Sequence, residues 1–318
     1  MKIARVAVLG AGAVGSYVIW GLSRCQGVEF SLVAEGSRAK RLEENGIVIN
    51  GERYRPEVLS PEAAHDVDLL IVCLKYGALK GALESIRQVT GPHTTVMSLM
   101  NGVDSEEIIG GAVGAEHVLP ALVKVASSKQ GEGYRFDPVT TKGIVFGEFA
   151  APFNSERVQA IEELFTQANL HFRSTDNIED EIWGKFRLNV CNNLPQAILG
   201  VGVGCYEDSE HVIAIRSGLK REVEAVASAK GIDLSRIDAS ATSGSAVPPT
   251  ARFSTLQDLD AGRHTEIDMF AGAMMRMGKE LGIPTPYCEY TFHMIKAIEE
   301  RNDGLFDYDG TEAVTCSK

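Results

Sequence analysis

A glycine-rich turn near the start of the chain has the residue types and spacing of a dinucleotide-binding loop. Gly10, Gly12 and Gly15 form the pattern G-x-G-x-x-G directly after an apolar segment, Arg5–Leu9. The first glycine allows a tight turn, the second lets the backbone approach a pyrophosphate, and the third lets a helix pack closely on the strand. Free N–H groups at the start of that helix bind the phosphates. We therefore predict that a nicotinamide dinucleotide is bound by Gly10, Ala11, Gly12, Ala13, Val14 and Gly15.

Charged residues after the second expected strand leave the choice between NAD and NADP open. Glu35 lies 20 residues after Gly15, where an acid takes the ribose hydroxyls and favours NAD. Arg38 follows with Lys40 and Arg41, and this basic group could hold the 2′-phosphate of NADP. The same three residues could also form a solvated helix face. The acid points to NAD and the basic group to NADP.

Two polar residues directly follow later apolar segments. Lys75 comes after Asp68–Leu74, and Asn101 comes after Thr95–Leu99. In a doubly wound sheet, ligands bind off the carboxyl ends of the strands. Lys75 is thus a candidate for a phosphate or ribose of the cofactor, and Asn101 for the nicotinamide ribose or the substrate. Taken singly, each has a simpler explanation, an exposed lysine and an Asn-Gly turn.

A polar stripe marks an otherwise apolar helical segment in the second half of the chain. Lys185, Asn189 and Asn193 are spaced by four, which places them along one side of a helix. On periodicity alone such a stripe is more often a solvated face. It could instead serve the reduction of a ketone, because an ammonium group can polarise a carbonyl and donate a proton to the developing alkoxide. Pro195 removes a backbone hydrogen bond to the carbonyl of Cys191 and should kink this helix.

A second polar cluster begins at Ser254. Ser254 fits a helix N-cap, and Gln257 three residues later completes a capping box. Glu266 lies twelve residues after Ser254, just over three turns, and is predicted on a similar helical face. This acid is either solvated or close to Lys185.

The first 175 residues alternate short apolar runs with helical stretches, which predicts a parallel sheet covered on both faces. A mixed-sheet extension is expected over His117–Ser128, Gly133–Asp137 and Gly143–Phe149, followed by a helix over Asn154–Ala168 with Asn154 as its N-cap. The expected strands are Arg5–Leu9, Glu29–Ala34, Asp68–Leu74 and Thr95–Leu99, and the expected helices are Val14–Arg24, Ser37–Asn45, Ala78–Gln88 and Asp104–Ile109.

The strand pattern ends at about Ser174. Helical segments are expected at 178–200, 208–230, 255–282 and 286–301, with Trp183, Phe186, Val190 and Leu194 on faces that can be buried. The fold class predicted is therefore α/β: a Rossmann doubly wound sheet in residues 1–175 and an all-helical domain in residues 176–318.

Composition excludes several classes of protein. The chain has 31 basic and 43 acidic residues, and its net charge of −12 argues against a nucleic-acid-binding surface. No signal peptide is expected at its start, and no apolar stretch approaches the roughly 20 residues of a membrane helix. Its 6 cysteines include no Cys-x-x-Cys pair, which favours reduced thiols over disulfides or a metal site. These features predict a cytoplasmic protein that binds neither nucleic acid nor membranes.

Taken in order, these motifs resemble the ketopantoate reductase (2-dehydropantoate 2-reductase) family. Each motif is weak alone, but the ordered set is specific and spans nearly the whole chain. Gly272 and the stretch Gly282–Pro286 add to the likeness. The other motifs that carry it are Gly10–Gly15, Lys75, Asn101-Gly102, Lys185-x₃-Asn189-x₃-Asn193, Ser254-x₂-Gln257-Asp258 and Thr265-Glu266-Ile267-Asp268.

The resemblance implies an NAD(P)H-dependent oxidoreductase that reduces ketopantoate to pantoate for pantothenate and coenzyme A synthesis. Its helical domain would be of the type found at the C-terminal end of 6-phosphogluconate dehydrogenase. The sequence itself leaves the oligomeric state open, and apolar surface on the helical segments could make a homodimer. Lys185 would be the general acid, and Lys75 and Glu266 would contact the cofactor. The residues implied to hold the substrate are Asn189, Asn193, Ser254 and, between substrate and cofactor, Asn101.

Two departures from the family pattern keep alternatives open. The family usually has a basic residue at the end of the second strand, where this chain has Glu35, so NAD and NADP both remain possible. Some members have a further substrate asparagine about eighteen residues after the lysine, where this chain has Val203. The alternatives are a paralogous reductase of another small 2-keto acid, and a dinucleotide-binding regulator without turnover.

Overall fold

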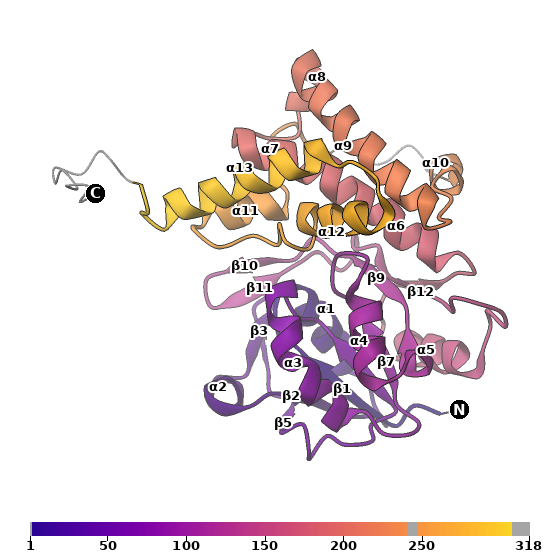
Figure 1. Ribbon diagram of the computed structural model, residues 1–318. Coiled ribbons are helices and arrows are strands. Elements are labelled where there is room, and N and C mark those ends of the chain that lie inside the picture. The colour runs from indigo at the N-terminus through magenta and orange to yellow at the C-terminus, as the bar shows by residue number, and fades with distance from the viewer. Residues whose placement is uncertain (1, 241–246, 307–318) are drawn as a thin grey trace, which may run out of the picture. The chain divides into compact units, whose positions relative to one another are not determined.

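The computed structural model describes residues 2–240 and 247–306. The chain divides into two compact units, which we call the N-terminal unit (Met1–Ile182) and the C-terminal unit (Trp183–Lys318) (Figure 1). The boundary predicted from the sequence falls after residue 175. It lies later because helix α6 (Ile178–Leu188) begins within the N-terminal unit, where Ile178 and Ile182 are buried with Leu122 and Val145 in one apolar cluster.

Within the described residues, the central sheet of the N-terminal unit has six strands in the order β5-β2-β1-β6-β7-β8, all parallel. Along the chain this order is 3-2-1-4-5-6, that of the Rossmann fold. The predicted doubly wound sheet is therefore confirmed. Its strands are β1 (Arg5–Leu9), β2 (Glu29–Val33), β5 (Glu57–Leu59), β6 (Leu69–Val72), β7 (Thr95–Ser98) and β8 (Val118–Leu119).

The central strands are apolar throughout because both faces of the sheet are covered. Successive side chains point to opposite faces. Val6 and Val8 of β1 accordingly lie in one buried cluster, and Ala7 and Leu9 lie in another. The helices that connect the strands of this sheet are α1 (Ala13–Leu22), α2 (Gly36–Asn45), α3 (Tyr76–Val89) and α4 (Ser105–Val113), followed by the 3₁₀ turn η1 (Ala115–His117).

Two smaller sheets extend the N-terminal unit, as the sequence predicted. One has the order β10-β11-β3-β4 and the other β13-β12-β9. Strands β3, β4, β5 and β13 were missed, because three-residue runs carry too little periodicity to be recognised. The remaining strands are β3 (Ile47–Ile49), β4 (Glu52–Tyr54), β9 (Ala121–Lys124), β10 (Ser128–Gln130), β11 (Gly133–Arg135), β12 (Gly143–Phe146) and β13 (Phe172–Ser174).

Two local predictions in this unit are wrong. The segment His117–Ser128 is divided among β8, β9 and β10, because Pro120 between β8 and β9 has no N–H for a sheet ladder. Helix α5 (Glu156–Gln167) is capped by Ser155, whose hydroxyl accepts the N–H of Val158 at 3.3 Å, and not by Asn154.

The C-terminal unit contains no strand among its described residues, 183–240 and 247–306, so the all-helical prediction holds there. Trp183, Phe186, Val190 and Leu194 are buried as expected, and the rings of Trp183 and Phe186 pack edge to face 5.6 Å apart. After α6 come the π-helical segment η2 (Asn189–Asn193), α7 (Leu194–Leu199), α8 (Cys205–Asp208), α9 (Glu210–Ala229), α10 (Ser235–Ser240), α11 (Ser254–Asp260), α12 (Ala271–Leu281) and α13 (Pro286–Asn302).

The single helix expected over 255–282 is two helices, α11 and α12. Helix α11 stops at Asp260 because Gly262 has φ +62°, a left-handed conformation that favours glycine. The N–H of Arg263 then returns to the carbonyl of Asp258 at 2.8 Å. None of the described helices is both long enough and apolar enough to cross a membrane.

A buried acid joins two helices of the C-terminal unit. Glu222 on α9 is 7% exposed, and its carboxylate accepts the N–H groups of Tyr287 at 2.6 Å and Cys288 at 2.8 Å. Those N–H groups lie in the first turn of α13, where an α-helix has donors without intrahelical acceptors and a positive dipole end. Glu222 therefore caps α13 from a neighbouring helix.

We predict that Glu222→Gln lowers the free energy of unfolding by about 1–3 kcal/mol, because an amide offers one acceptor where the carboxylate offers two. Urea titration followed by circular dichroism measures this change. Glu300→Gln is the matched control, since Glu300 is exposed on α13, and it should leave the midpoint unchanged. Equal midpoints for both variants would show that Glu222 does not stabilise the junction.

Candidate functional site

The glycine-rich loop joins β1 to α1 at the point where the Rossmann sheet reverses its strand order, between β1 and β6. Gly10 has φ +113°, and a Cβ on it would come within 2.5 Å of the carbonyl oxygen of Cys73. A Cβ on Gly15 would overlap the carbonyl oxygen of Gly10. Both glycines are therefore required by the packing of the chain itself.

Gly12 is different, because a Cβ there would meet no heavy atom of the described residues within 4 Å. Its φ of −94° is also open to other residues. The packing of the described residues does not require glycine at this position, and Gly12 is the N-cap of α1, with open space beside it. That space suits the phosphates of a dinucleotide.

The other candidate cofactor residues of this unit follow the carboxyl ends of neighbouring strands. Glu35 follows β2 and precedes α2, and Lys75 follows β6 and precedes α3. Both side chains are exposed, as is that of Arg38 on α2. The hydroxyl of Ser85 donates to Oε2 of Glu35 at 3.2 Å. The strand order thus gathers residues distant in sequence at one edge of the sheet.

Asn101 lies in the turn between β7 and α4, and a buried chain of polar groups holds that turn. The N–H of Met100 donates to Oγ of Ser98 at 3.4 Å, and the Ser98 and Ser105 hydroxyls lie 2.9 Å apart. The Ser105 hydroxyl donates to Oε2 of Glu106 at 2.8 Å. These hydrogen bonds were not predicted from the sequence, although a serine at the end of an apolar strand signals a hydrogen-bonding need.

A further hydrogen bond connects the turn that carries Asn101 to the segment that carries Lys75. The hydroxyl of Tyr76, the first residue of α3, donates to Oδ2 of Asp104 at 2.7 Å. Tyr76 adjoins Lys75, and Asp104 lies three residues after Asn101. One hydrogen bond thus sets the spacing of two candidate site residues that come from different strands.

The C-terminal unit carries the predicted polar stripe. Lys185 lies on α6 and is half-buried, while Asn189 and Asn193 lie on η2. The Asn193 amide donates to Oδ1 of Asn189 at 3.4 Å, so these two side chains are brought together. The expected break at Pro195 is also present: the helix widens to a π-helical turn over 189–193 and returns to α geometry at α7.

Ser254 and Glu266 lie elsewhere than predicted. Ser254 is the exposed first residue of α11, whose N-cap is Phe253. The capping box is therefore wrong, and the Gln257 amide donates instead to the carbonyl of Arg252 at 2.6 Å. Glu266 lies in the non-helical connection between α11 and α12, so its expected place on the same helical face is also wrong.

The connection that carries Glu266 is held by a buried acid. Oε1 of Glu299, on α13, accepts both the N–H and the hydroxyl of Thr265 at 2.7 Å. Glu299 is 3% exposed and is also paired with Lys296 at 3.3 Å. This contact fixes the backbone directly before Glu266.

Family comparisons agree with this division of the chain. Residues 6–151 match the model described as "Ketopantoate reductase PanE/ApbA", and residues 177–299 match that described as "Ketopantoate reductase PanE/ApbA C terminal". Together the two matches cover most of both units. The chain belongs to the ketopantoate reductase family. It is therefore a member of an oxidoreductase family.

Individual members of the ketopantoate reductase family resemble the chain over almost its full length. The 2-dehydropantoate 2-reductase of Streptococcus pyogenes serotype M3 is 27% identical over 306 residues, which cover 92% of this chain and 97% of that protein. A crystal structure of a ketopantoate reductase from Ralstonia eutropha has a TM-score of 0.77 at 27% identity, covering 94% of this chain and 99% of that one.

The same fold occurs in a D-mandelate dehydrogenase solved with NADH and anilino(oxo)acetate. Its TM-score is 0.81 at 23% identity, covering 94% of this chain and 99% of that one. At this level of identity the likeness shows the shared fold alone.

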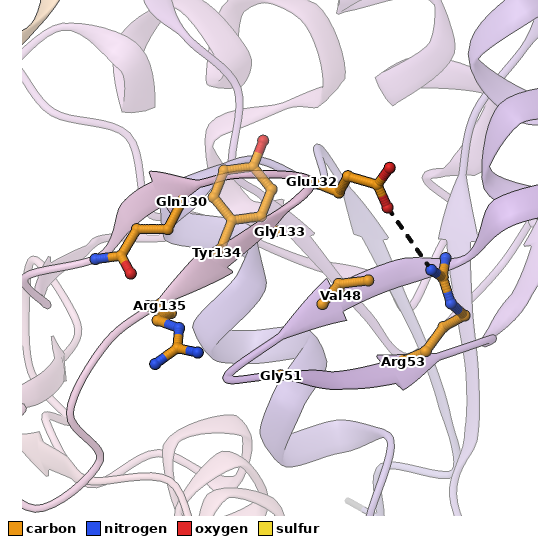
Figure 2. A pocket seen from close by; sticks show the side chains of 8 residues that line it. All are labelled: Val48, Gly51, Arg53, Gln130, Glu132, Gly133, Tyr134 and Arg135. Carbon is orange, nitrogen blue, oxygen red and sulfur yellow. Dashed lines mark ion pairs between the residues drawn. The ribbon is translucent and has the colours of Figure 1, made fainter.

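A separate hollow on the four-stranded sheet contains none of the candidate residues. Figure 2 shows Glu132 directed toward Arg53, and their charged groups are 4.0 Å apart. Arg53 also donates to the carbonyl of Asn45. Arg53 is thus engaged by the chain itself, and we assign the hollow no role in the ketopantoate reductase site. The hollow is lined by Val48, Gly51, Arg53, Gln130, Glu132, Gly133, Tyr134 and Arg135.

The contrast between Gly12 and Gly15 gives a direct test of the cofactor loop. Gly12→Ala should leave the melting temperature unchanged and weaken NAD(P)H binding by about tenfold or more, since the methyl group fills only the space for the phosphates. Gly15→Ala should lower the melting temperature, because its Cβ overlaps the Gly10 carbonyl. Differential scanning fluorimetry and fluorescence titration measure the two effects. Unchanged NAD(P)H affinity in Gly12→Ala would contradict this assignment.

Glu106 makes the stability of the Asn101 turn depend on pH. Burial raises the pKa of Glu106 from 4.5 to about 7, against the opposing effect of the Ser105 hydroxyl. The folded state therefore binds more protons than the unfolded state between these two values. The contribution of Glu106 to the free energy of unfolding therefore falls as the pH rises from 4.5 to about 7. Its slope is at most about 1.4 kcal/mol per pH unit.

We predict that Glu106→Gln removes this pH-dependent contribution to the free energy of unfolding. The difference in unfolding free energy between variant and wild type should shift in favour of the variant as the pH rises from 5 to 8. Urea titrations at several pH values measure this shift. Glu107→Gln, at an exposed neighbouring position, should follow the wild-type pH profile. Parallel profiles for wild type and Glu106→Gln would refute the prediction.

Proposed function

We propose that the chain is an NAD(P)H-dependent 2-dehydropantoate 2-reductase, which reduces ketopantoate to pantoate for pantothenate and coenzyme A synthesis. The observation that carries the proposal is a glycine loop with open space at Gly12, in a chain whose two units both match the ketopantoate reductase family. The helical unit adds a lysine and two hydrogen-bonded asparagines of the types that such a reduction needs.

The residues of the N-terminal unit fit a dinucleotide. The loop 10–15 would receive the diphosphate, and Lys75 and Asn101, tied together through Tyr76 and Asp104, would contact its ribose or phosphate groups. Glu35 supports NADH and Arg38 supports NADPH. Glu266 of the C-terminal unit is a further proposed cofactor contact. The bound nicotinamide would supply a hydride to the carbonyl carbon of the substrate.

The residues of the C-terminal unit would bind the keto acid and supply the proton. Negative charge develops on the carbonyl oxygen during reduction, and the Lys185 ammonium would donate a proton to that oxygen. The amides of Asn189 and Asn193 and the hydroxyl of Ser254 would bind polar groups of the substrate. Neutral hydrogen-bonding groups of this kind do not add to the net charge of −12, which opposes an anionic substrate.

A second candidate is the reduction of a different small 2-keto acid. Val203 stands where some family members have an asparagine, and its N–H is bonded to the carbonyl of Ala251 at 3.0 Å, three residues before Ser254. A valine side chain cannot hydrogen-bond a substrate hydroxyl. This position favours a substrate that is less polar than ketopantoate.

The test is oxidation of NADH and NADPH by the purified protein with ketopantoate as the only keto acid, followed by absorbance. Saturable oxidation is the expected result, and the preferred dinucleotide shows whether Glu35 or Arg38 governs the choice. Turnover only with 2-keto acids that lack the hydroxyl would establish the second candidate. Binding of both dinucleotides without turnover of any keto acid would leave a regulatory dinucleotide-binding protein.

We predict that Lys185→Ala lowers kcat by about 10²–10⁴-fold, since a general acid contributes an effect of this size. The dissociation constant of NAD(P)H should remain unchanged. Stopped-flow kinetics and fluorescence titration measure the two quantities. Lys230→Ala, at an exposed position after α9, is the control and should behave as wild type. An undiminished kcat in Lys185→Ala would remove the proposed proton donor.

A further inference from the structure

The π-helical segment η2 coincides with a side chain inserted into the helix. In a regular α-helix the carbonyls of Cys191 and Asn192 would accept the N–H groups of residues 195 and 196. Residue 195 is a proline and has no N–H. The hydroxyl of Tyr206, on α8, lies 2.6 Å from the carbonyl oxygen of Asn192 and 3.4 Å from that of Cys191.

The Tyr206 hydroxyl therefore donates to the Asn192 carbonyl, the group that the N–H of Gln196 would reach in a regular α-helix. Insertion of this kind is a recognised cause of a local break in a helix. Burial raises the pKa of Tyr206, which keeps its hydroxyl protonated and able to donate. The Arg216 guanidinium lies over the Tyr206 ring, 5.3 Å from its centroid.

Removal of that hydroxyl would leave buried backbone groups without a partner. Cys191 is 4% exposed, and an unpaired buried carbonyl costs about 1–3 kcal/mol. The helix can avoid this cost by closing toward α geometry, with the N–H of Gln196 bonded directly to the Asn192 carbonyl. Such closure rotates Asn193 relative to Asn189, because both lie in the widened turn.

Gln196 connects the same helix to the segment that carries Ser254. It is fully buried, and its amide donates to the carbonyl of Ala251 at 2.9 Å while accepting the N–H of Phe253 at 2.7 Å. Phe253 is the N-cap of α11, and Ser254 is the first residue of that helix. One glutamine side chain thus fixes the backbone directly before Ser254.

We propose that Tyr206 and Gln196 are positioning residues for the 2-keto acid. Tyr206 maintains the π-helical turn that presents Asn189 and Asn193, and Gln196 holds Ser254 at a fixed place relative to that turn. The three substrate-binding positions then act as one preorganised group. This inference rests on the proposed function and adds the residues that set the geometry of its substrate site.

Tyr206→Phe removes only the inserted hydroxyl. We expect the KM for the keto acid to rise about tenfold, which corresponds to about 1.4 kcal/mol, while the dissociation constant of NAD(P)H stays unchanged. Amide hydrogen exchange over 189–197 should change, because the backbone hydrogen bonds of the widened turn rearrange. Tyr290→Phe is the matched control, because Tyr290 is 66% exposed, and it should change neither quantity. A lower melting temperature with an unchanged KM would reduce Tyr206 to a purely structural role and overturn its part of the proposal.

Gln196→Met keeps the length of the side chain and removes both hydrogen bonds to the 251–253 segment. We expect it to raise the KM for the keto acid in the wild-type background and to add nothing in a Ser254→Ala background. Such non-additivity is the signature of a residue that acts through another. Additive effects in this double-mutant cycle would overturn the role of Gln196.

Hydrogen exchange separates failure of this inference from failure of the proposed function. If no keto acid is turned over by the wild type, the proposed function fails, and exchange over 189–197 and 251–256 still tests the two contacts. Altered exchange over 189–197 in Tyr206→Phe and faster exchange over 251–256 in Gln196→Met would support the positioning roles. Unchanged exchange would overturn them.

Discussion

The close contact between Gly10 and the carbonyl of Cys73 is the constraint on which the cofactor half of the molecule depends. Strands β1 and β6 are neighbours in the parallel sheet, and the chain leaves both at the same edge. A Cβ at Gly10 would collide with the Cys73 carbonyl, so only a bare Cα lets the loop cross there. The start of α1 and the segment leading to Lys75 are thereby placed side by side, with the space at Gly12 left open.

Buried polar side chains secure the irregular segments that carry the candidate site. Glu106, Gln196 and Glu299 each bind backbone or hydroxyl groups of a loop next to a candidate residue, at Asn101, Ser254 and Glu266 respectively. A buried polar group without a partner is costly, so each of these contacts specifies one position of its loop. Rigid supports of this kind reduce the entropy lost when a ligand is bound.

The two units contribute different chemistry to the proposed reaction. The N-terminal unit offers backbone N–H groups and open space, which suit a diphosphate. The C-terminal unit offers one ammonium group, two amides and a hydroxyl, which suit a keto acid and a proton transfer. The π-helical turn that carries Asn189 and Asn193 has a cause in the sequence. Pro195 removes a backbone donor, and Tyr206 supplies a donor from another helix.

Much of this arrangement could be predicted from the sequence. The Rossmann sheet follows from continuous apolar strands, the loop from the spacing of Gly10, Gly12 and Gly15, and the helical unit from apolar periodicity after Ser174. These features are local or periodic, so neighbouring residues carry the signal. The disruption near Pro195 was predictable for the same reason, since a proline lacks its N–H in any context.

Other features were decided only by the tertiary structure. The expected helix through Ser254 and Glu266 is broken at Gly262, and Gln257 bonds to Arg252 instead of completing a capping box. Tyr206 and Gln196 escaped notice because their partners lie on other elements, 14 and 55 residues away along the chain. Glu106 escaped notice because its burial, and not the adjacent Ser105, gives it an unusual environment. Periodicity records which face of a helix is apolar, but a hydrogen bond between distant segments leaves no repeat in the sequence. The sequence alone thus determined the fold and the types of chemical group present, and the tertiary contacts decided how those groups are held.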